Sequence, residues 1–390
     1  MRLAVWAFVL GALSFTEGCH RRRRGGGRRA ETDPRKRYAT GCVDPRYVYA
    51  PPTPVPNGGG TAPRSPVTVH AGTQYIHAWA AAEGVFAWRE GTAEPYHIAT
   101  RSPEGGVTGA AAGDRAVLAW KDGSSGLVSV VTLDAQGAAA WSPTLGSGRN
   151  LALAASRTLI ALVTEEGDGE EARVVLRLHS REGRALANPV SVAPREAAHD
   201  PAITWTGARF VVAWRTGSET AGAIRMATVS PEGERLSEPV DVVRPRTPVG
   251  APSIAWGAGR VGVTWADRAE GDPALHSTAV DLTGRRLGEP QRLSARYRMD
   301  ARASLAWDGA AFGVVWWEPV GGGVPRAYGA LVGRDGRRIE TEMRWWVEGD
   351  VAMREPAVVW DAPDYVMLAL RGADGIELRR TGPRLCDMPL

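Results

Sequence analysis

The chain has 390 residues, of which 44% are hydrophobic and 23% are charged, so it is long enough to build one large domain or two ordinary ones with a sizeable core. This composition excludes a collagen-like, a globally disordered or a polytopic membrane protein. The 47 glycines and 27 prolines predict frequent turns, and 15 tryptophans against 5 phenylalanines is an unusual ratio.

The charge is concentrated at one end of the chain. Residues 1–41 contain ten Lys or Arg and three Asp or Glu, a net charge of +7, whereas the whole chain is +4, so residues 42–390 carry −3. A nucleic-acid-binding protein spreads basic charge over its folded surface. We therefore expect no nucleic-acid partner.

The N-terminus has the pattern of an export signal. Arg2 precedes an apolar run from Leu3 to Leu13, which is shorter than the roughly 20 residues that a membrane-spanning helix needs. A short basic start, an apolar centre and small residues after it are typical of a secretory signal peptide. We expect this signal to cover residues 1–18.

The signal ends in Thr16, Glu17, Gly18 and Cys19. This segment resembles the lipobox of bacterial lipoproteins, and the resemblance implies that Cys19 carries a lipid anchor. Thr16 and Glu17 depart from the usual lipobox residues. The alternative is an ordinary signal peptide in which Cys19 has no special role.

Residues 19–64 are predicted to form a flexible tether. Arginines at 21–24, glycines at 25–27 and prolines between 51 and 56 all oppose collapse into a core. Beside an acyl anchor, the basic arm would bind anionic lipid, at about 1 kcal/mol for each basic residue near the surface. The alternative is a solvated tether without a binding role.

Two cysteines remain if Cys19 is lipidated. Cys42 precedes the folded body and Cys386 follows it. Export makes a disulfide between Cys42 and Cys386 chemically possible. The alternatives are two free thiols or a zinc site, and zinc is disfavoured because neither cysteine has a Cys or His neighbour at ligand spacing.

An internal repeat is the main structural signal. In each repeat a short apolar strand ends in Trp, a turn follows, and a second apolar strand ends nine residues later. This pattern is clearest at DPAITWTGARFVVAWR 200–215, APSIAWGAGRVGVTWA 251–266, ARASLAWDGAAFGVVWW 301–317 and EPAVVWDAPDYVMLAL 355–370. The same frame places second-strand ends at residues 88, 120, 163, 214, 265, 316 and 369, which makes seven repeats.

Each repeat is predicted to contain four strands. A third strand follows each hairpin, as at 223–233, and a weaker fourth strand comes next, as at 238–245. Seven repeats of four short antiparallel strands predict an all-β, seven-bladed β-propeller. Residues 65–72 have the sequence pattern of a fourth strand, whereas the last repeat ends with its third strand at 376–382. We therefore expect residues 65–72 to complete the last blade.

The predicted propeller therefore covers residues 65–382 and leaves a tail at 383–390. Its closure would bring Cys42 close to Cys386. The repeats resemble those of β-propeller lipoproteins of bacterial cell envelopes. The likeness rests on the order of strands and turns, since the series motifs of WD40, kelch and sialidase repeats are absent. The resemblance implies an exported protein, attached to the membrane through the acyl anchor and the basic arm.

The recurring tryptophans are predicted to fill the gaps between blades, because large flat side chains suit a space that widens away from the axis. The alternative is a platform on which sugars or bases stack. Trp141, Trp345 and Trp346 fall outside the repeat pattern and are candidates for exposed contacts; the alternative is that they fill gaps in outer strands.

An acidic residue recurs two residues after the predicted end of the second strand, except in the repeats that have Thr216 and Arg371 there. The series consists of Glu90, Asp122, Glu165, Asp267 and Glu318. These acids are the candidate ligand face: an acidic ring near the central channel would bind a cation or a basic partner. The alternative is that each carboxylate accepts hydrogen bonds within its own turn and stays solvated.

Catalytic patterns are missing from the sequence. The histidines of the body share no repeat position and no metal-ligand spacing, and no nucleophile elbow occurs. His199 and Asp200 precede a first strand and are interpreted as a turn; the alternative is an acid–base pair. We expect no catalytic residue, no metal and no cofactor.

The leading hypothesis is a monomeric, exported, lipid-anchored binding or scaffold propeller of the cell envelope, whose variable loops contact an envelope protein or glycan. The first alternative is a glycan hydrolase or lyase with a pair of channel carboxylates. The second is a purely structural envelope component.

Overall fold

The computed structural model describes residues 53–381, apart from residues 135, 138, 143–145, 195, 218–220, 246, 270, 295, 320–323, 340–351 and 362–363. The predicted signal peptide, most of the tether and the tail at 383–390 therefore lie outside the described residues. So do Cys19, Cys42, Cys386, Trp345 and Trp346.

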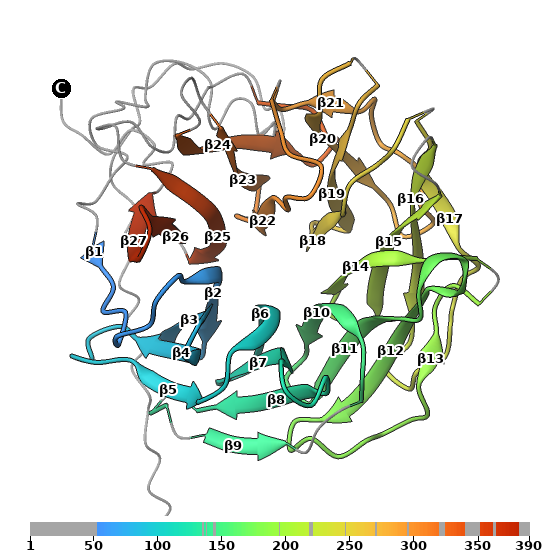
Figure 1. Ribbon diagram of the computed structural model, residues 1–390. Helices are drawn as coiled ribbons and strands as arrows, with labels where there is room; N and C mark the ends of the chain where they lie inside the picture. The colour runs from blue at the N-terminus through green and yellow to red at the C-terminus, as the bar shows by residue number, and fades with distance from the viewer. Residues whose placement is uncertain are drawn as a thin grey trace, which may run out of the picture. The chain divides into compact units, whose positions relative to one another are not determined.

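The described chain forms seven antiparallel sheets arranged in a ring, which confirms the predicted seven-bladed β-propeller (Figure 1). The first three blades follow the chain and have four strands each. They are β2 (Arg64–Ala71), β3 (Gln74–Ala81), β4 (Gly84–Arg89) and β5 (Tyr96–Ala99); β6 (Pro103–Ala112), β7 (Arg115–Asp122), β8 (Val128–Leu133) and β9 (Ala139–Ser142); and β10 (Arg149–Ala155), β11 (Leu159–Glu166), β12 (Arg173–Ser180) and β13 (Val190–Ser191).

The fourth and fifth blades also have four strands, and the sixth has three within the described residues. These strands are β14 (His199–Trp205), β15 (Phe210–Gly217), β16 (Gly222–Val229) and β17 (Val240–Val243); β18 (Ser253–Gly257), β19 (Arg260–Asp267), β20 (Ala274–Val280) and β21 (Gln291–Arg292); and β22 (Ser304–Trp307), β23 (Ala311–Pro319) and β24 (Pro325–Gly333). The four-strand pattern predicts a further strand after β24, where residues 340–351 lie outside the described part of the chain.

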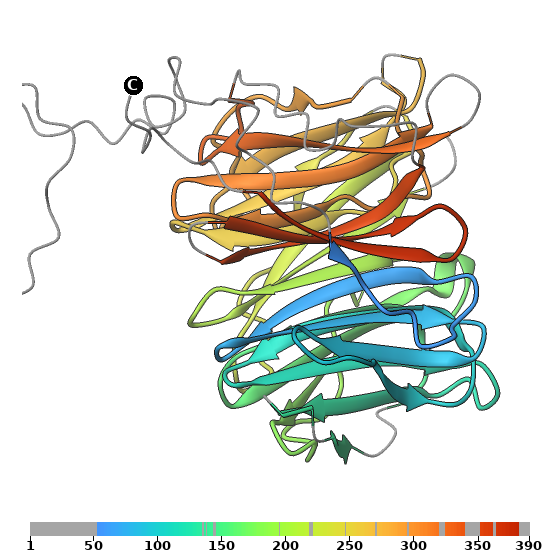
Figure 2. The same ribbon diagram turned by 90° about the vertical axis from the view of Figure 1, so that its left-hand side faces the viewer.

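The seventh blade joins both ends of the described chain. It contains β25 (Met353–Asp361), β26 (Asp364–Arg371), β27 (Gly375–Thr381) and, on its outer edge, β1 (Thr53–Pro54). Thr53 pairs with Leu378 in this ladder, and β1 lies beside β27 in both views (Figures 1 and 2). An N-terminal strand does close the ring, as the sequence predicts.

The prediction that residues 65–72 close the ring is wrong. Residues 64–71 form β2, the innermost strand of the first blade, because the two-residue turn after Ala71 folds them back onto β3, with Val69 opposite Ile76. Trp79 therefore lies on a second strand and Trp88 on a third. The sequence analysis had assigned them to a first and a second strand. This shift by one strand explains the short spacing between the first and second repeats. The closing strand β1 falls within the range assigned to the tether.

The first strand of every blade lies innermost, so β2, β6, β10, β14, β18, β22 and β25 surround the ring axis (Figure 1). Since the strands alternate in direction, each blade has two distinct ends. The loop face carries the segments that lead into the first strands and the loops between second and third strands. The turn face carries the tight turns between first and second strands.

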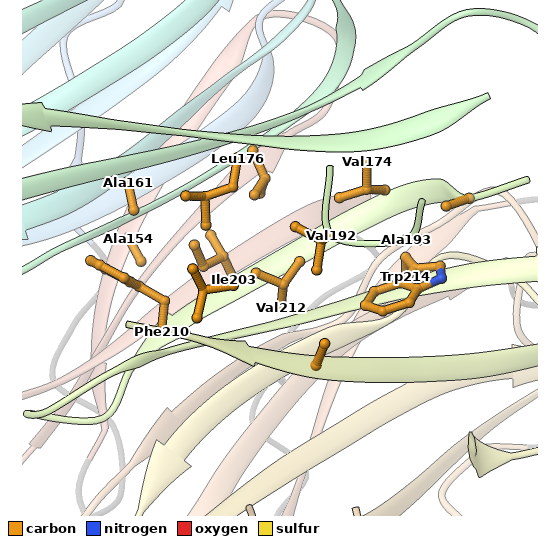
Figure 3. Close-up of a cluster of buried hydrophobic side chains, with 14 of the residues drawn as sticks. Ala154, Ala161, Val174, Leu176, Val192, Ala193, Ile203, Phe210, Val212 and Trp214 are labelled. Atoms are coloured by element: carbon orange, nitrogen blue, oxygen red, sulfur yellow. The ribbon is translucent and has the colours of Figure 1, made fainter. Parts of the chain in front are cut away.

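The tryptophan on the second strand is buried between blades, as predicted. Trp79, Trp120, Trp214, Trp265 and Trp316 have at most 3% of their surface exposed. Between the third and fourth blades, Trp214 packs with aliphatic side chains of both sheets (Figure 3). Burial of one such apolar side chain stabilises the fold by about 1.5–3 kcal/mol.

The tryptophans at the ends of the first strands have a different role. Trp205, Trp256, Trp307 and Trp360 are half-buried and lie at the turn-face ends of β14, β18, β22 and β25. A Cβ atom at Gly257 would lie 2.1 Å from Cδ2 of Trp307, so this ring lies against the backbone of the preceding blade. These rings cover the gaps between blades close to the axis.

Helical structure is almost absent. A single 3-10 turn, η2 (Gly169–Glu171), interrupts the strands of the described residues. Within this part of the chain, no helix has the length and apolar character that a membrane span requires.

Candidate functional site

A strained residue marks the loop-face end of several innermost strands. Ser65, Asn150, Asp200 and Glu355 have φ values between 49° and 52°, and each lies at a bulge where the pairing with the second strand shifts register. Gly105 occupies the same place in the second blade. A left-handed conformation costs a non-glycine residue roughly 1–2 kcal/mol, so surrounding contacts must hold it.

Carboxylates provide these contacts across blade boundaries. The backbone N–H of Ser65 donates to Oε2 of Glu355 in the seventh blade at 2.6 Å. The backbone N–H of Asp200 likewise donates to Oε2 of Glu165 in the third blade at 2.9 Å. The bulges therefore fix neighbouring blades to each other at the loop face, close to the axis.

Glu165 is the centre of the densest polar network at this face. Its side chain is 2% exposed and lies at the end of β11. Besides the Asp200 N–H, it accepts hydrogen bonds from Arg149 Nη2 at 2.7 Å and from Asn150 Nδ2 at 2.8 Å, and His199 Nδ1 lies 3.0 Å from Oε1. Two blades thus supply partners to one carboxylate.

The network keeps Glu165 ionised. Burial by itself would raise the pKa of Glu165, but the hydrogen bonds from Asp200, Asn150, His199 and Arg149 outweigh it and lower the pKa to about 2. A buried carboxylate with this many donors is a rigid anion that orients its neighbours. It has no proton to donate near neutral pH.

Asp200 forms a second node beside Glu165. Arg215 Nε donates to its Oδ2 at 2.8 Å, and Arg302 Nη2 lies 3.7 Å from its Oδ1. Arg302 also donates from Nη1 to the carbonyl of Pro201 at 3.0 Å. Because Arg302 precedes β22 of the sixth blade, it reaches past the fifth blade to contact the fourth.

The predicted acidic series does not form one ring. Glu90 follows β4, a third strand, so it lies at the turn face, where it receives two hydrogen bonds from Arg380 and contacts His77. In the third blade Glu165 lies opposite Arg149, and in the second blade Lys121 lies opposite Glu104 at the same register. Glu165 therefore corresponds to Lys121, one residue before Asp122. Glu90 lies at the opposite face because the sequence analysis assigned the strands of the first repeat one strand too late.

The other three acids share one register at the loop face and bond within their own blades. Trp265 Nε1 donates to Asp267 at 2.8 Å, and Trp316 Nε1 donates to Glu318 at 2.7 Å. Asp122 accepts from the backbone N–H groups of Ser124 and Ser125, and with the Ser124 hydroxyl these lower its pKa to about 2. Asp122 therefore holds its turn, Glu318 holds the adjacent tryptophan, and Asp267, which also accepts from the Ala269 N–H, holds both.

Arg149, Arg215 and Arg302 were missed by the sequence analysis, and His199 with Asp200 was interpreted as a turn. A signal was present for His199 and Asp200, though not for the three arginines. Three blades begin with a basic residue, a polar residue and proline, at 64–66, 199–201 and 354–356. No group of three His, Cys, Asp or Glu side chains suited to a metal ion occurs among the described residues.

No family model matches the sequence, and no curated protein matches it. Solved structures with the same fold include a subtype N11 neuraminidase-like protein of A/flat-faced bat/Peru, with 9% identity, a TM-score of 0.51 and coverage of 87% of this chain and 94% of that one. Hydrazine synthase of Kuenenia stuttgartiensis has 10% identity, a TM-score of 0.52 and coverage of 84% and 99%. At these identities the likeness shows the fold alone.

Proposed function

We propose that this protein is a non-catalytic binding module that holds its ligand on the loop face, beside the ring axis. The observation that carries the proposal is the network around Glu165. Side chains of the third and fourth blades meet there at hydrogen-bonding distances, and Arg302 of the sixth blade donates to the nearby backbone carbonyl of Pro201. A charged site on a rigid scaffold suits recognition, because little ordering is needed when the ligand binds.

The pKa shifts of nine described acidic side chains fit a binding role better than proton donation to a glycan. A hydrolase needs a carboxylic acid whose raised pKa keeps it protonated until it donates to the leaving oxygen. The shifts resolved for Glu90, Asp122, Glu165 and Asp267 are all downward, and so are those for Glu83, Glu182, Asp241, Asp281 and Asp300. These groups are held as anions.

The proposed location at the cell envelope follows from the N-terminal sequence. Residues 1–18 are a signal peptide, Cys19 carries the lipid, and the basic arm contributes to binding at an anionic membrane surface. The protein is a monomer of the cell envelope. The intact mass of protein recovered from membranes tests this: loss of residues 1–18 with a lipid increment on Cys19 supports the anchor, whereas cleavage without lipid overturns it.

The binding function is tested with the full chain and two matched variants. Glu165→Gln keeps the shape of the side chain but removes the charge that orients Arg149 and His199. Glu182→Gln makes the same change in the same blade, at an exposed turn after β12 on the turn face. Each protein is titrated by calorimetry with solubilised envelope proteins, peptidoglycan fragments and envelope polysaccharide.

Wild type and Glu182→Gln should bind the same envelope component with the same affinity. Glu165→Gln should bind that component at least about tenfold more weakly, as expected when a buried charged partner is lost. Circular dichroism checks that both variants are folded. Retention of full affinity by a folded Glu165→Gln variant would overturn the proposed site. Release of reducing sugar ends from the polysaccharide would overturn the non-catalytic role and favour the hydrolase.

A further inference from the structure

We infer that ordered water binds inside the propeller, in the seam between the fifth and sixth blades, along a row of polar side chains that crosses all four strands of the fifth blade. The strand register places these side chains opposite one another, from the innermost strand to the outer edge. The row is Ser253 on β18, Thr264 on β19, Ser277 on β20 and Gln291 on β21. This site is separate from the network around Glu165.

The row faces the sixth blade. Side chains two residues apart on a strand point to the same face, so Thr264 shares its face with Ala266. Ala266 packs in one cluster with Trp316 of the sixth blade. The third and fourth blades have apolar side chains in the corresponding row, which are Ala152, Val163, Leu176 and Val190, and Ala202, Ala213, Met226 and Val240. The fifth blade therefore has a polar row where these two blades have an apolar one.

The two central hydroxyls of the row are buried without a protein partner. Thr264 and Ser277 are each 1% exposed, and neither hydroxyl forms a hydrogen bond within the described residues. The hydroxyl of Tyr297, whose ring packs into the same cluster as Ala266, is also buried and unpaired in this part of the chain. Proteins rarely leave such groups unsatisfied, because a lost hydrogen bond is costly, and ordered water supplies the partner where side chains do not.

The seam has space for water beside Ser277. Val212 of the fourth blade and Val314 of the sixth blade take the same register position, so the facing wall is alike in both seams. The third blade places Leu176 toward this wall (Figure 3), whereas the fifth blade has the much smaller Ser277 in that position. Neighbouring strands lie about 4.8 Å apart, a distance that one water molecule spans with two hydrogen bonds of about 2.8 Å.

Both ends of the row reach solvent. Ser253 on the innermost strand and Gln291 on the outermost strand are half-buried, whereas the two hydroxyls between them are enclosed. The Gln291 amide donates from Nε2 to the carbonyls of Glu289 and Pro290 at 3.0 and 3.3 Å. Water therefore has a polar path into the seam from the axis and from the outer edge.

The test counts long-lived buried water molecules in the full-length protein by magnetic relaxation dispersion of oxygen-17 water. The double variant Thr264→Val with Ser277→Ala replaces both hydroxyls by apolar groups of similar size, and it should hold at least one such water fewer than wild type. Thr278→Val is the matched control. Thr278 is buried on the same strand but points to the opposite face, and its hydroxyl donates to the Gly288 carbonyl at 3.4 Å. This control should keep the wild-type count.

An unchanged count in the folded double variant overturns the inference. A higher melting temperature of that variant together with an unchanged count would show that both hydroxyls are unpaired in a dry seam. An equal loss of water in Thr278→Val also overturns it, because the missing water would then belong elsewhere. A crystal structure of wild type decides without any variant: ordered water within hydrogen-bonding distance of Thr264 and Ser277 supports the site, and density without it overturns the site.

Discussion

His77 illustrates how a single residue couples this fold to pH. It is fully buried, lies between Tyr75 and Trp88 in a stack of rings, and hydrogen-bonds Thr68 through Nδ1. Burial lowers the pKa of His77 below its usual 6.5, although the Glu90 carboxylate partly opposes the shift. The folded state therefore binds this proton less readily than the unfolded chain does.

We predict that the protein loses stability as the pH falls below about 6.5, where the unfolded chain takes up the proton and the folded protein does not. The free energy of unfolding in urea, measured between pH 5 and 7.5, should decrease toward acid. His77→Gln should flatten this slope. An unchanged slope in that variant would mean that other groups, such as the buried His179, cause the dependence.

Gly257 is a second residue whose identity is set by one contact. An added Cβ atom would overlap the Trp307 ring of the next blade. We predict that Gly257→Ala lowers the free energy of unfolding by roughly 1–3 kcal/mol through overpacking. Combining it with Trp307→Leu tests the cause in a double-mutant cycle. Strictly additive effects would contradict the proposed overlap.

At the scale of elements, the seam between the first and seventh blades depends on side-chain contacts as well as on β1. Arg380 of β27 donates from Nη2 to both carboxylate oxygens of Glu90, at 2.8 and 2.6 Å, and its guanidinium lies 4.7 Å from the centre of the Tyr75 ring. This half-buried pair connects the first blade to the last. Its loss leaves the Glu90 carboxylate with His77 as a neighbour.

Arg380→Met should therefore destabilise the protein measurably and increase hydrogen exchange in β1 and β27 before the other strands. Arg285→Met is the control, because Arg285 pairs with Asp281 on the exposed surface and such pairs contribute little. Uniform exchange in Arg380→Met would show that the seam is not the weakest part of the ring.

For the whole molecule, closure depends on a strand of two residues, β1, paired to the edge of β27. The chain segments that contain Cys42 and Cys386 continue from these two neighbouring strands. We predict that a disulfide joins Cys42 to Cys386 and stabilises the ring by constraining the unfolded chain, with a typical magnitude of about 2–4 kcal/mol.

Peptide mapping without reductant should recover the two cysteines in one linked peptide, and reduction should lower the melting temperature. The Cys42→Ser variant should melt like the reduced protein and should no longer respond to reductant. Two free thiols in the mapped protein would contradict the prediction.

The sequence by itself determined the strands, their number in each blade and the number of blades. Short apolar strands, buried tryptophans and turn residues recur locally, so their spacing is visible along one chain. A sequence pattern cannot show which strands pair when two segments have similar patterns. Residues 65–72 look like a fourth strand and become a first strand only because β3 folds back on them.

Only the tertiary structure decided the site. Arg149, Glu165, Asp200 and Arg302 come from segments up to about 150 residues apart, and they meet because ring closure brings the ends of the innermost strands around one axis. The sequence marks Asp200 as a polar residue before proline and Glu165 as a member of the acidic series, whereas Arg149 and Arg302 belong to no pattern. The physical reason is that strand formation depends on neighbours in the chain, whereas convergence of charges depends on the geometry of the whole ring.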